Sequence, residues 1–176
     1  CVDGGVMENI TVDNITIEGT LAPLYLRLGQ RNRRYHPDVA IEKDSTMKNI
    51  TFSNITATGG SHNWGCAFLG LTGNRIEGLT LSNITIEAPG GGTQKEAERV
   101  VPDRVRPYPQ ATWWGKMPAY GFFIRNVDDV EIDNVRFTTI EEDARPAFIL
   151  DEVHGSVVRN IETESASRTP LVSVSE

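Results

Sequence analysis

The residues best suited to chemistry in this sequence are its paired carboxylates. Cleavage of a glycosidic bond needs an acid and a base or nucleophile held about 5 to 9.5 Å apart. The candidates are Asp13, the pair Asp128-Asp129 and the pair Asp151-Glu152. Both pairs fall where other copies of an internal repeat have turn residues, so we predict a structural role for them. The three histidines are scattered without metal-ligand spacing, and we predict no metal and no cofactor.

A cluster of arginines could bind a ligand, and it stands out because the chain is acidic, with a net charge of -7. Arg27, Arg31, Arg33 and Arg34 precede Tyr35 in a segment that interrupts the regular rhythm of the chain. A guanidinium group presents a planar fork of donors that matches a carboxylate, so the cluster could bind an acidic substrate. The alternative is a solvated loop whose arginines pair with the acidic remainder of the chain.

Two tryptophans, Trp113 and Trp114, lie in a long connection, 89–118, that we expect to form an inserted flap. Their large flat rings could stack on sugars, or they could pin the flap to the body of the protein. Within this flap, Thr93 followed three positions later by Glu96 predicts a capping box at the start of a short helix.

An internal repeat organises the elements that position these residues. In each copy apolar residues alternate, the alternation slips by one position at an asparagine, and it then resumes. Asparagine tolerates the left-handed conformation, so each copy is predicted to form a strand, an asparagine corner and a second strand. The copies are 7–18, 47–58, 76–87, 128–138 and 153–163, with the corners Asn14, Asn54, Asn83, Asn134 and Asn160.

Short apolar segments between the copies supply further strands. Self-similarity at a few tens of residues is typical of a solenoid. The sequence therefore predicts an all-β fold, a right-handed parallel β-helix (solenoid) of about five turns, in which residues 1–176 form a single domain. The short segments are expected to align the aromatic residues Tyr25, Phe68, Phe123 and Phe148 in one column. This column lies either on the outer face or in the interior.

Composition narrows the possible partners. The acidic charge argues against a nucleic acid, and the absence of a run of 18 apolar residues argues against a membrane span. The two cysteines impose no disulfide framework, and Cys66 is expected to be buried and free. The acidic run 141–143 is expected to be a solvated turn. The chain enters the repeat within a few residues of Cys1, so we expect a C-terminal fragment of a longer β-helix whose open first turn could pair with a second copy.

Several segments together resemble the C-terminal part of bacterial glycoside hydrolase family 28 proteins, the polygalacturonase-like family. They are N-I-T-x-x-N-I-T, P-L-Y-L-R-L-G-Q-R, A-P-G-G-G, Y-P-Q followed by W-W-G-K-M-P-A-Y-G-F-F-I-R-N-V, and A-R-P-A-F-I-L-D-E-V. The resemblance implies a right-handed parallel β-helix and inverting hydrolysis of pectin-type bonds in galacturonan or rhamnogalacturonan. It also implies a plant cell-wall polysaccharide or oligosaccharide as partner, no metal cofactor, and a secreted or periplasmic location.

The catalytic signatures of that family are missing from this sequence. They are N-T-D, D-D after Gly or Gln, G-H-G and R-I-K, and in the family they precede the N-I-T turns. We therefore assign no catalytic residue, and we expect a glycosidase as the parent protein but no activity in this chain alone. The alternative is a noncatalytic β-helix module that binds carbohydrate or packs against a partner. The residues predicted to contact substrate are Arg27, Arg31, Arg33, Arg34, Tyr35, Trp113 and Trp114.

Overall fold

The computed structural model describes residues 1–61, 65–164 and 171–175. Within them the protein is predominantly β, as the sequence predicts, and its two helices are single short turns. Helix α1 (Gln94–Ala97) and the 3-10 helix η1 (Ala111–Trp114) both lie between β5 and β6. The strands are β1 (Val6–Glu18), β2 (Tyr25–Arg27), β3 (Thr46–Thr58), β4 (Cys66–Leu69), β5 (Ile76–Ala88), β6 (Phe122–Thr139), β7 (Phe148–Glu164) and β8 (Val172–Ser175).

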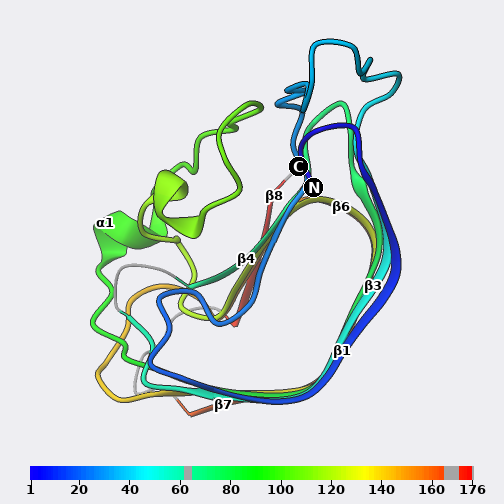
Figure 1. Cartoon of the computed structure of the whole chain (residues 1–176). Helices are drawn as coiled ribbons and strands as arrows, with labels where there is room; N and C mark the ends of the chain where they lie inside the picture. Colours follow the sequence, from blue (N-terminus) through cyan, green and yellow to red (C-terminus); the bar gives the residue numbers. More distant parts are fainter. Residues whose placement is uncertain (62–64, 165–170, 176) are drawn as a thin grey trace.

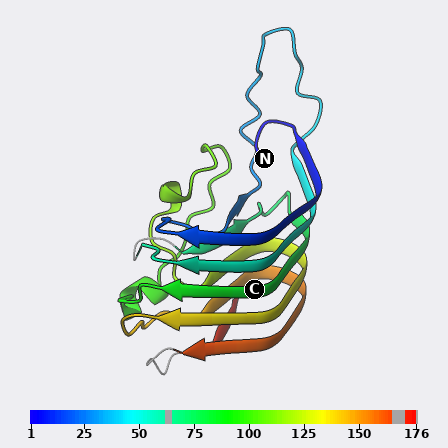
Figure 2. The same ribbon diagram turned by 60° about the horizontal axis from the view of Figure 1, so that its bottom comes forward.

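All the strands belong to one parallel sheet. Successive long strands pair in the order β1, β3, β5, β6 and β7, so each repeat copy lies directly beside the next. The short strands pair in a second series, β2, β4, β6, β7 and β8, because β6 and β7 are long enough to take part in both. Figures 1 and 2 show the strands stacked in layers along one axis.

Asparagines in the left-handed conformation bend the long strands at the predicted corners. The five corner residues have φ angles between 53 and 57°, and the register stacks them in a single file, which confirms the prediction. Their side chains bond along the file: the Nδ2 of Asn83 donates to the Oδ1 of Asn54 at 3.1 Å, and the Nδ2 of Asn134 donates to the Oδ1 of Asn83 at 2.8 Å. Each copy is one continuous bent strand rather than two strands.

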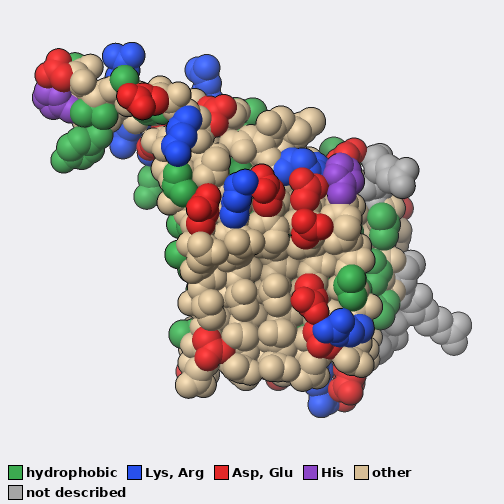
Figure 3. Space-filling view, turned by 90° about the vertical axis from the view of Figure 1, so that its right-hand side faces the viewer, with side chains coloured by type: hydrophobic (Ala, Val, Ile, Leu, Met, Phe, Trp, Pro, Cys, Tyr) green, Lys and Arg blue, Asp and Glu red, His purple; other side chains and the backbone are tan. Residues whose placement is uncertain are grey.

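A second file of bends, which the alternation pattern did not indicate, lies five positions earlier in each copy. Its members also have positive φ angles, and they are Asn9, Asn49, Gly78, Asp129 and Gly155. With two bends, each long strand follows the core along three short straight runs. Figure 3 shows that the face carrying these bends is largely uncharged, with charged side chains in rows near its borders and on the loop that projects from it.

The core lies inside these layers and is filled by the alternate residues of every strand. Among its largest members are Phe122, Phe137 and Phe148, whose ring centroids lie between 4.9 and 5.4 Å apart in edge-to-face contact. Cys66 is buried in the same core and free, as predicted. Edge-to-face contacts between rings add to the stabilisation by apolar burial because the positive edge of one ring meets the negative face of another.

The predicted aromatic column is wrong. The register places Tyr25 beside Ala67, which in turn lies beside Phe123, whereas Phe68 lies between Leu26 and Ile124. Phe148 lies beside Phe122, one position out of step with Phe123. A shift of one residue moves a side chain to the other face of a strand, so the four aromatic residues are divided between the interior and the outer face.

The segment 89–118 covers the outer face of the short strands. Helix α1 has the predicted capping box, in which the Glu96 amide donates to Thr93 Oγ1 at 3.3 Å and the Thr93 amide donates to Glu96 Oε2 at 3.0 Å. Further along, Trp114 and Met117 pack on Ala67 and its neighbours in a second apolar cluster. The outer residues of β2, β4 and β6 are thereby shielded from water, and Figure 1 shows α1 and the loop after it beside these strands.

The acidic run 141–143 is not a solvated turn throughout, because Asp143 is fully buried. Its carboxylate accepts hydrogen bonds of 3.0 and 2.6 Å from the Arg145 guanidinium group, one of 2.8 Å from the Arg145 amide and one of 3.1 Å from the Gly92 amide. Arg145 also donates to the carbonyl of Met117 at 3.1 Å. A buried carboxylate requires such partners, and here they tie both ends of the segment 89–118 to the connection between β6 and β7.

Candidate functional site

The structure brings together the two regions in which the sequence predicted ligand-binding residues. The Gln30 amide donates to the carbonyl of Val105 at 3.0 Å, which fastens the arginine-containing loop 28–45 to the segment 89–118. Beside this bond, the guanidinium carbon of Arg31 lies 5.4 Å from the centre of the Tyr108 ring. The two loops therefore form one continuous surface at the end of the short strands.

Arg27 does not belong to that surface, because its side chain is buried at the end of β2 with 3% exposure. Its guanidinium carbon lies 5.1 Å from the centre of the Trp114 ring, and it donates to the carbonyls of Leu28 and Arg104. Burial among apolar groups lowers the pKa of Arg27 below its usual value. Arg27 supports the two loops from beneath and is not available to a ligand.

Trp114, at 2% exposure, is also part of the protein interior. Its ring contacts Tyr25 with the centroids 6.1 Å apart, so it pins the flap to the sheet, which is the structural role that the sequence left open. Trp113 is half-exposed, and no contact of its ring with the arginines is observed among the described residues. Of the two tryptophans, only Trp113 could stack on a sugar.

Arg31 is held at the surface by Asp3, with which it forms an ion pair and two side-chain hydrogen bonds. Asp3 also accepts a hydrogen bond from the Arg33 amide at 3.0 Å. The hydrogen bonds from Arg31, followed by the amide of Arg33, lower the pKa of Asp3 to about 2. Asp3 therefore stays ionised at neutral pH and fixes the start of the loop.

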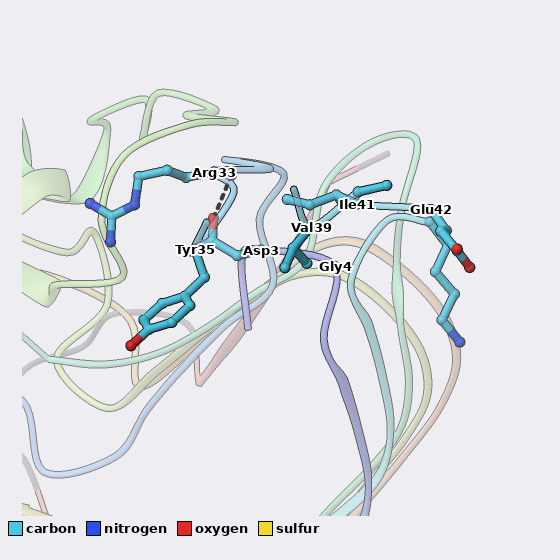
Figure 4. A pocket seen from close by; sticks show the side chains of 9 residues that line it. Asp3, Gly4, Arg33, Tyr35, Val39, Ile41 and Glu42 are labelled. Carbon is cyan, nitrogen blue, oxygen red and sulfur yellow. Dashed lines mark hydrogen bonds between the residues drawn. The ribbon is translucent and has the colours of Figure 1, made fainter. Parts of the chain in front are cut away.

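The remaining residues of the predicted cluster, Arg33, Arg34 and Tyr35, are exposed, and Tyr35 is fully so. Figure 4 shows the side chains of Arg33 and Tyr35 pointing to the same side, away from Val39 and Ile41. Arg33 and Tyr35 line a pocket of about 420 Å³ together with Asp3, Gly4 and the returning segment 39–43. A ligand that contacts these two side chains would therefore lie at the edge of this pocket.

Three exposed residues of the segment 89–118 were not included in the sequence prediction. They are Arg104, Arg106 and Tyr108, and the short run R-V-R-P-Y could have indicated them, since it resembles the arginine- and tyrosine-containing loop. We use the name arginine–tyrosine surface for the exposed and half-exposed set of Arg31, Arg33, Arg34, Tyr35, Arg104, Arg106 and Tyr108.

Three of the five carboxylates considered for catalysis are bound to other groups, and they are Asp13, Asp128 and Asp151. Asp128 pairs with Arg75 at 2.7 Å and with His154 at 3.1 Å, and Asp151 pairs with Arg125. Asp13 accepts hydrogen bonds from Ser53 at 2.5 Å and from Asn54 at 2.7 Å, and these lower its pKa. A general acid in glycoside cleavage needs the opposite shift. The contacts of these three carboxylates are those of structural groups.

In the part of the chain that the structure describes, no three residues among His, Cys, Asp and Glu gather as metal ligands. Neither described helix has the length and apolar character needed to cross a membrane. The site and the fold together define an all-β protein with one parallel sheet and a basic, aromatic loop surface at one side of it. Searches of protein-family models, of curated proteins and of solved structures each found no match to this chain.

Proposed function

We propose that this protein is a right-handed parallel β-helix and the C-terminal portion of a polygalacturonase-like glycoside hydrolase of family 28. The stacking of five successive long strands in parallel register supports the architecture. The hand follows from the general preference of parallel crossover connections for the right-handed form. The motifs quoted above support the family.

In this proposal the arginine–tyrosine surface binds a pectin-type acidic polysaccharide outside the cytoplasm. Galacturonate carries one carboxylate on each sugar unit, which suits the paired donors of a guanidinium group. The exposed ring of Tyr35 and the partly exposed ring of Tyr108 offer flat apolar surfaces to the faces of the sugars. The observation that carries the proposal is the bond between Gln30 and Val105, because it joins the basic residues of two distant loops in an acidic chain.

The chain by itself is proposed to bind without cleaving. Asp13, Asp128 and Asp151 are occupied by arginine, histidine, serine or asparagine partners. The inverting hydrolysis of the parent protein is assigned to carboxylates outside this chain. The pairing of these carboxylates also favours the second candidate function, that of a noncatalytic β-helix module that binds carbohydrate. The two candidate functions are distinguished by whether the whole gene encodes the catalytic signatures of the family.

The test is binding to polygalacturonate, measured by affinity electrophoresis and calorimetry, with dextran as a neutral comparison. The double variant Arg33→Ala/Arg34→Ala removes two exposed arginines and is expected to weaken binding about tenfold, or about 1.4 kcal/mol. Lys48→Ala removes a half-exposed cation, paired with Glu77 on the long strands, and serves as the control, with no change expected. Equal binding of the double variant and the unaltered protein would contradict the proposal.

A second test measures hydrolysis, as the release of reducing ends from polygalacturonate. This chain is expected to release none, whereas the proposed parent protein releases them. Turnover by this chain would mean that a catalytic pair has been overlooked and would overturn the assignment of binding alone.

A further inference from the structure

Three arginines of the arginine–tyrosine surface have guanidinium groups without a partner in the part of the chain that the structure describes. They are Arg33, Arg104 and Arg106, all of them exposed, and none forms an ion pair or a side-chain hydrogen bond there. Every other described arginine donates to a carboxylate or to a backbone carbonyl. The unpaired guanidinium groups are therefore gathered on one surface, although the chain has 24 acidic residues to pair with them.

Two acids next to these arginines bind other groups. Asp3 accepts a hydrogen bond from the Arg33 amide, but its ion pair is with Arg31. Asp103 accepts a hydrogen bond from the Thr72 hydroxyl group at 3.4 Å. In a chain with a net charge of -7, unpaired cations on one surface create a local positive field that attracts an anion.

The backbone that carries these guanidinium groups is fixed. The carbonyl of Arg104 accepts a hydrogen bond from the buried side chain of Arg27, and the carbonyl of Val105 accepts one from the Gln30 amide at 3.0 Å. Figure 4 shows the side chain of Arg33 extending toward the ribbon of the segment 89–118. A cation on a fixed backbone loses less conformational freedom when a ligand binds, so these groups are already organised for an anion.

We propose that Arg33, Arg104 and Arg106 form the carboxylate-binding core of this surface, and that its ligand is an acidic oligosaccharide with at least three free carboxylates. The role of this core rests on the proposed function, the binding of a pectin-type polysaccharide. A single exposed pair of guanidinium and carboxylate groups is weak in water. Three pairs on one ligand act together, because each contact raises the effective concentration of the next. A single uronate unit is therefore expected to bind too weakly to measure.

Two exposed rings favour a sugar over an acidic peptide as the carrier of the carboxylates. Tyr35 is fully exposed, and Tyr108 is more than half exposed. The ring of Tyr108 also lies 5.4 Å from the guanidinium carbon of Arg31, at the place where the two loops meet. The face of a sugar can pack on such a ring, whereas the side chains of a glutamate-rich peptide offer no flat surface.

The test is calorimetry with galacturonate, trigalacturonate, polygalacturonate and polyglutamate. The trimer is expected to bind, the monomer to give no measurable heat, and polyglutamate to bind more weakly than polygalacturonate. Arg33→Gln, Arg104→Gln and Arg106→Gln are each expected to weaken binding of the trimer by about two- to fivefold. Arg136→Gln makes the same change on the long part of β6, where Arg136 pairs with Glu164, and is the matched control with no change expected.

Different results would overturn different parts. If polygalacturonate binds but the three glutamine variants bind the trimer as tightly as the unaltered protein, the core is wrong and the proposed function stands. If polygalacturonate does not bind at all, both are wrong. Equal affinity for the monomer and the trimer would show that the arginines act separately. Equal affinity for polyglutamate and polygalacturonate would show that the surface recognises charge alone, and an acidic peptide would then replace the sugar as its ligand.

Discussion

The guanidinium group of Arg27 lies over the ring of Trp114, 5.1 Å from its centre, although Arg27 ends strand β2 and Trp114 ends the 3-10 helix η1. The contact is buried on both sides, so water competes with neither partner. A cation over an aromatic face is worth more when both groups are desolvated. This pair therefore fixes how the flap and the arginine-containing loop lie relative to each other.

Replacement of Trp114 by alanine is expected to lower the free energy of unfolding by about 3 to 5 kcal/mol, because a large buried ring is removed and leaves a cavity. Chemical denaturation measures the change. Trp113→Ala is the matched control, since the half-exposed ring of Trp113 should contribute about 0.5 kcal/mol or less. Similar losses in the two variants would mean that the flap is not held by Trp114.

The ion pair between Asp3 and Arg31 predicts a dependence of stability on acid. The pKa of Asp3 is about 2 in the folded protein, below its ordinary value of 3.8. A lowered folded pKa contributes stability above pH 3.8, and this contribution is lost as the pH falls toward 2. Asp3→Asn is therefore expected to cost roughly 1 kcal/mol at pH 7 and almost nothing near pH 2. Urea denaturation at several pH values measures the difference, and a constant difference would contradict it.

The buried carboxylate of Asp143 predicts a strong effect on the flap. Asp143→Ala leaves Arg145 buried without its carboxylate partner, which typically costs about 3 to 5 kcal/mol. Limited proteolysis is expected to cut the variant within residues 98–110 well before it cuts the unaltered protein. Glu141→Ala, at an exposed position in the same run, is the control and should be cut at the original rate.

Structural features that depend on neighbouring residues could be predicted from the sequence, whereas features that depend on residues far apart in the chain could not. The corner asparagines were predictable because a phase slip and a residue that accepts a positive φ angle occur at the same position. The pairing of Asp143 was not, because it bonds the Gly92 amide, 51 positions earlier in the chain. The aromatic column failed for a related reason: a one-residue offset between P-L-Y-L-R and C-A-F-L-G is decided by the loops that precede them.

The arginine cluster was likewise predicted only in part: its presence could be read from the sequence, but the burial of its individual members could not. The sequence revealed an excess of positive charge, but the division between Arg27 inside and Arg33 outside depends on where the flap returns to the sheet. Arg104 and Tyr108 were missed because they lie far from the cluster in sequence. They lie beside it in space through the bond from Gln30 to Val105.

The two thiols are expected to differ in reactivity. Cys66 is fully buried, and burial raises the pKa of its thiol to about 12. At pH 8 about one Cys66 in ten thousand is then a thiolate, and the thiolate is the reactive form. A thiol reagent such as Ellman's reagent should label one cysteine, Cys1, in the native protein and both in denaturant. Rapid labelling of both in the native protein would contradict the burial of Cys66.

Asn54, whose φ angle is 54°, represents the file of corner residues. Asn54→Ala places an ordinary residue in the left-handed region, which costs about 1 to 2 kcal/mol. The variant also loses the bonds of this side chain to Asp13 at 2.7 Å and to Asn83 at 3.1 Å. Its total loss on denaturation should therefore exceed that of Asn54→Gly.

The glycine variant separates the two contributions, because it accepts the backbone angle while removing the same side-chain bonds. Gly78 already occupies a bend with a positive φ angle in this protein, so the geometry is one that glycine fulfils here. Thr56→Ala, two positions away on the exposed side of β3, should change the stability by about 0.5 kcal/mol or less and controls for truncation alone. If Asn54→Ala and Asn54→Gly were equally stable, backbone conformation would not be what bends the strand at this corner.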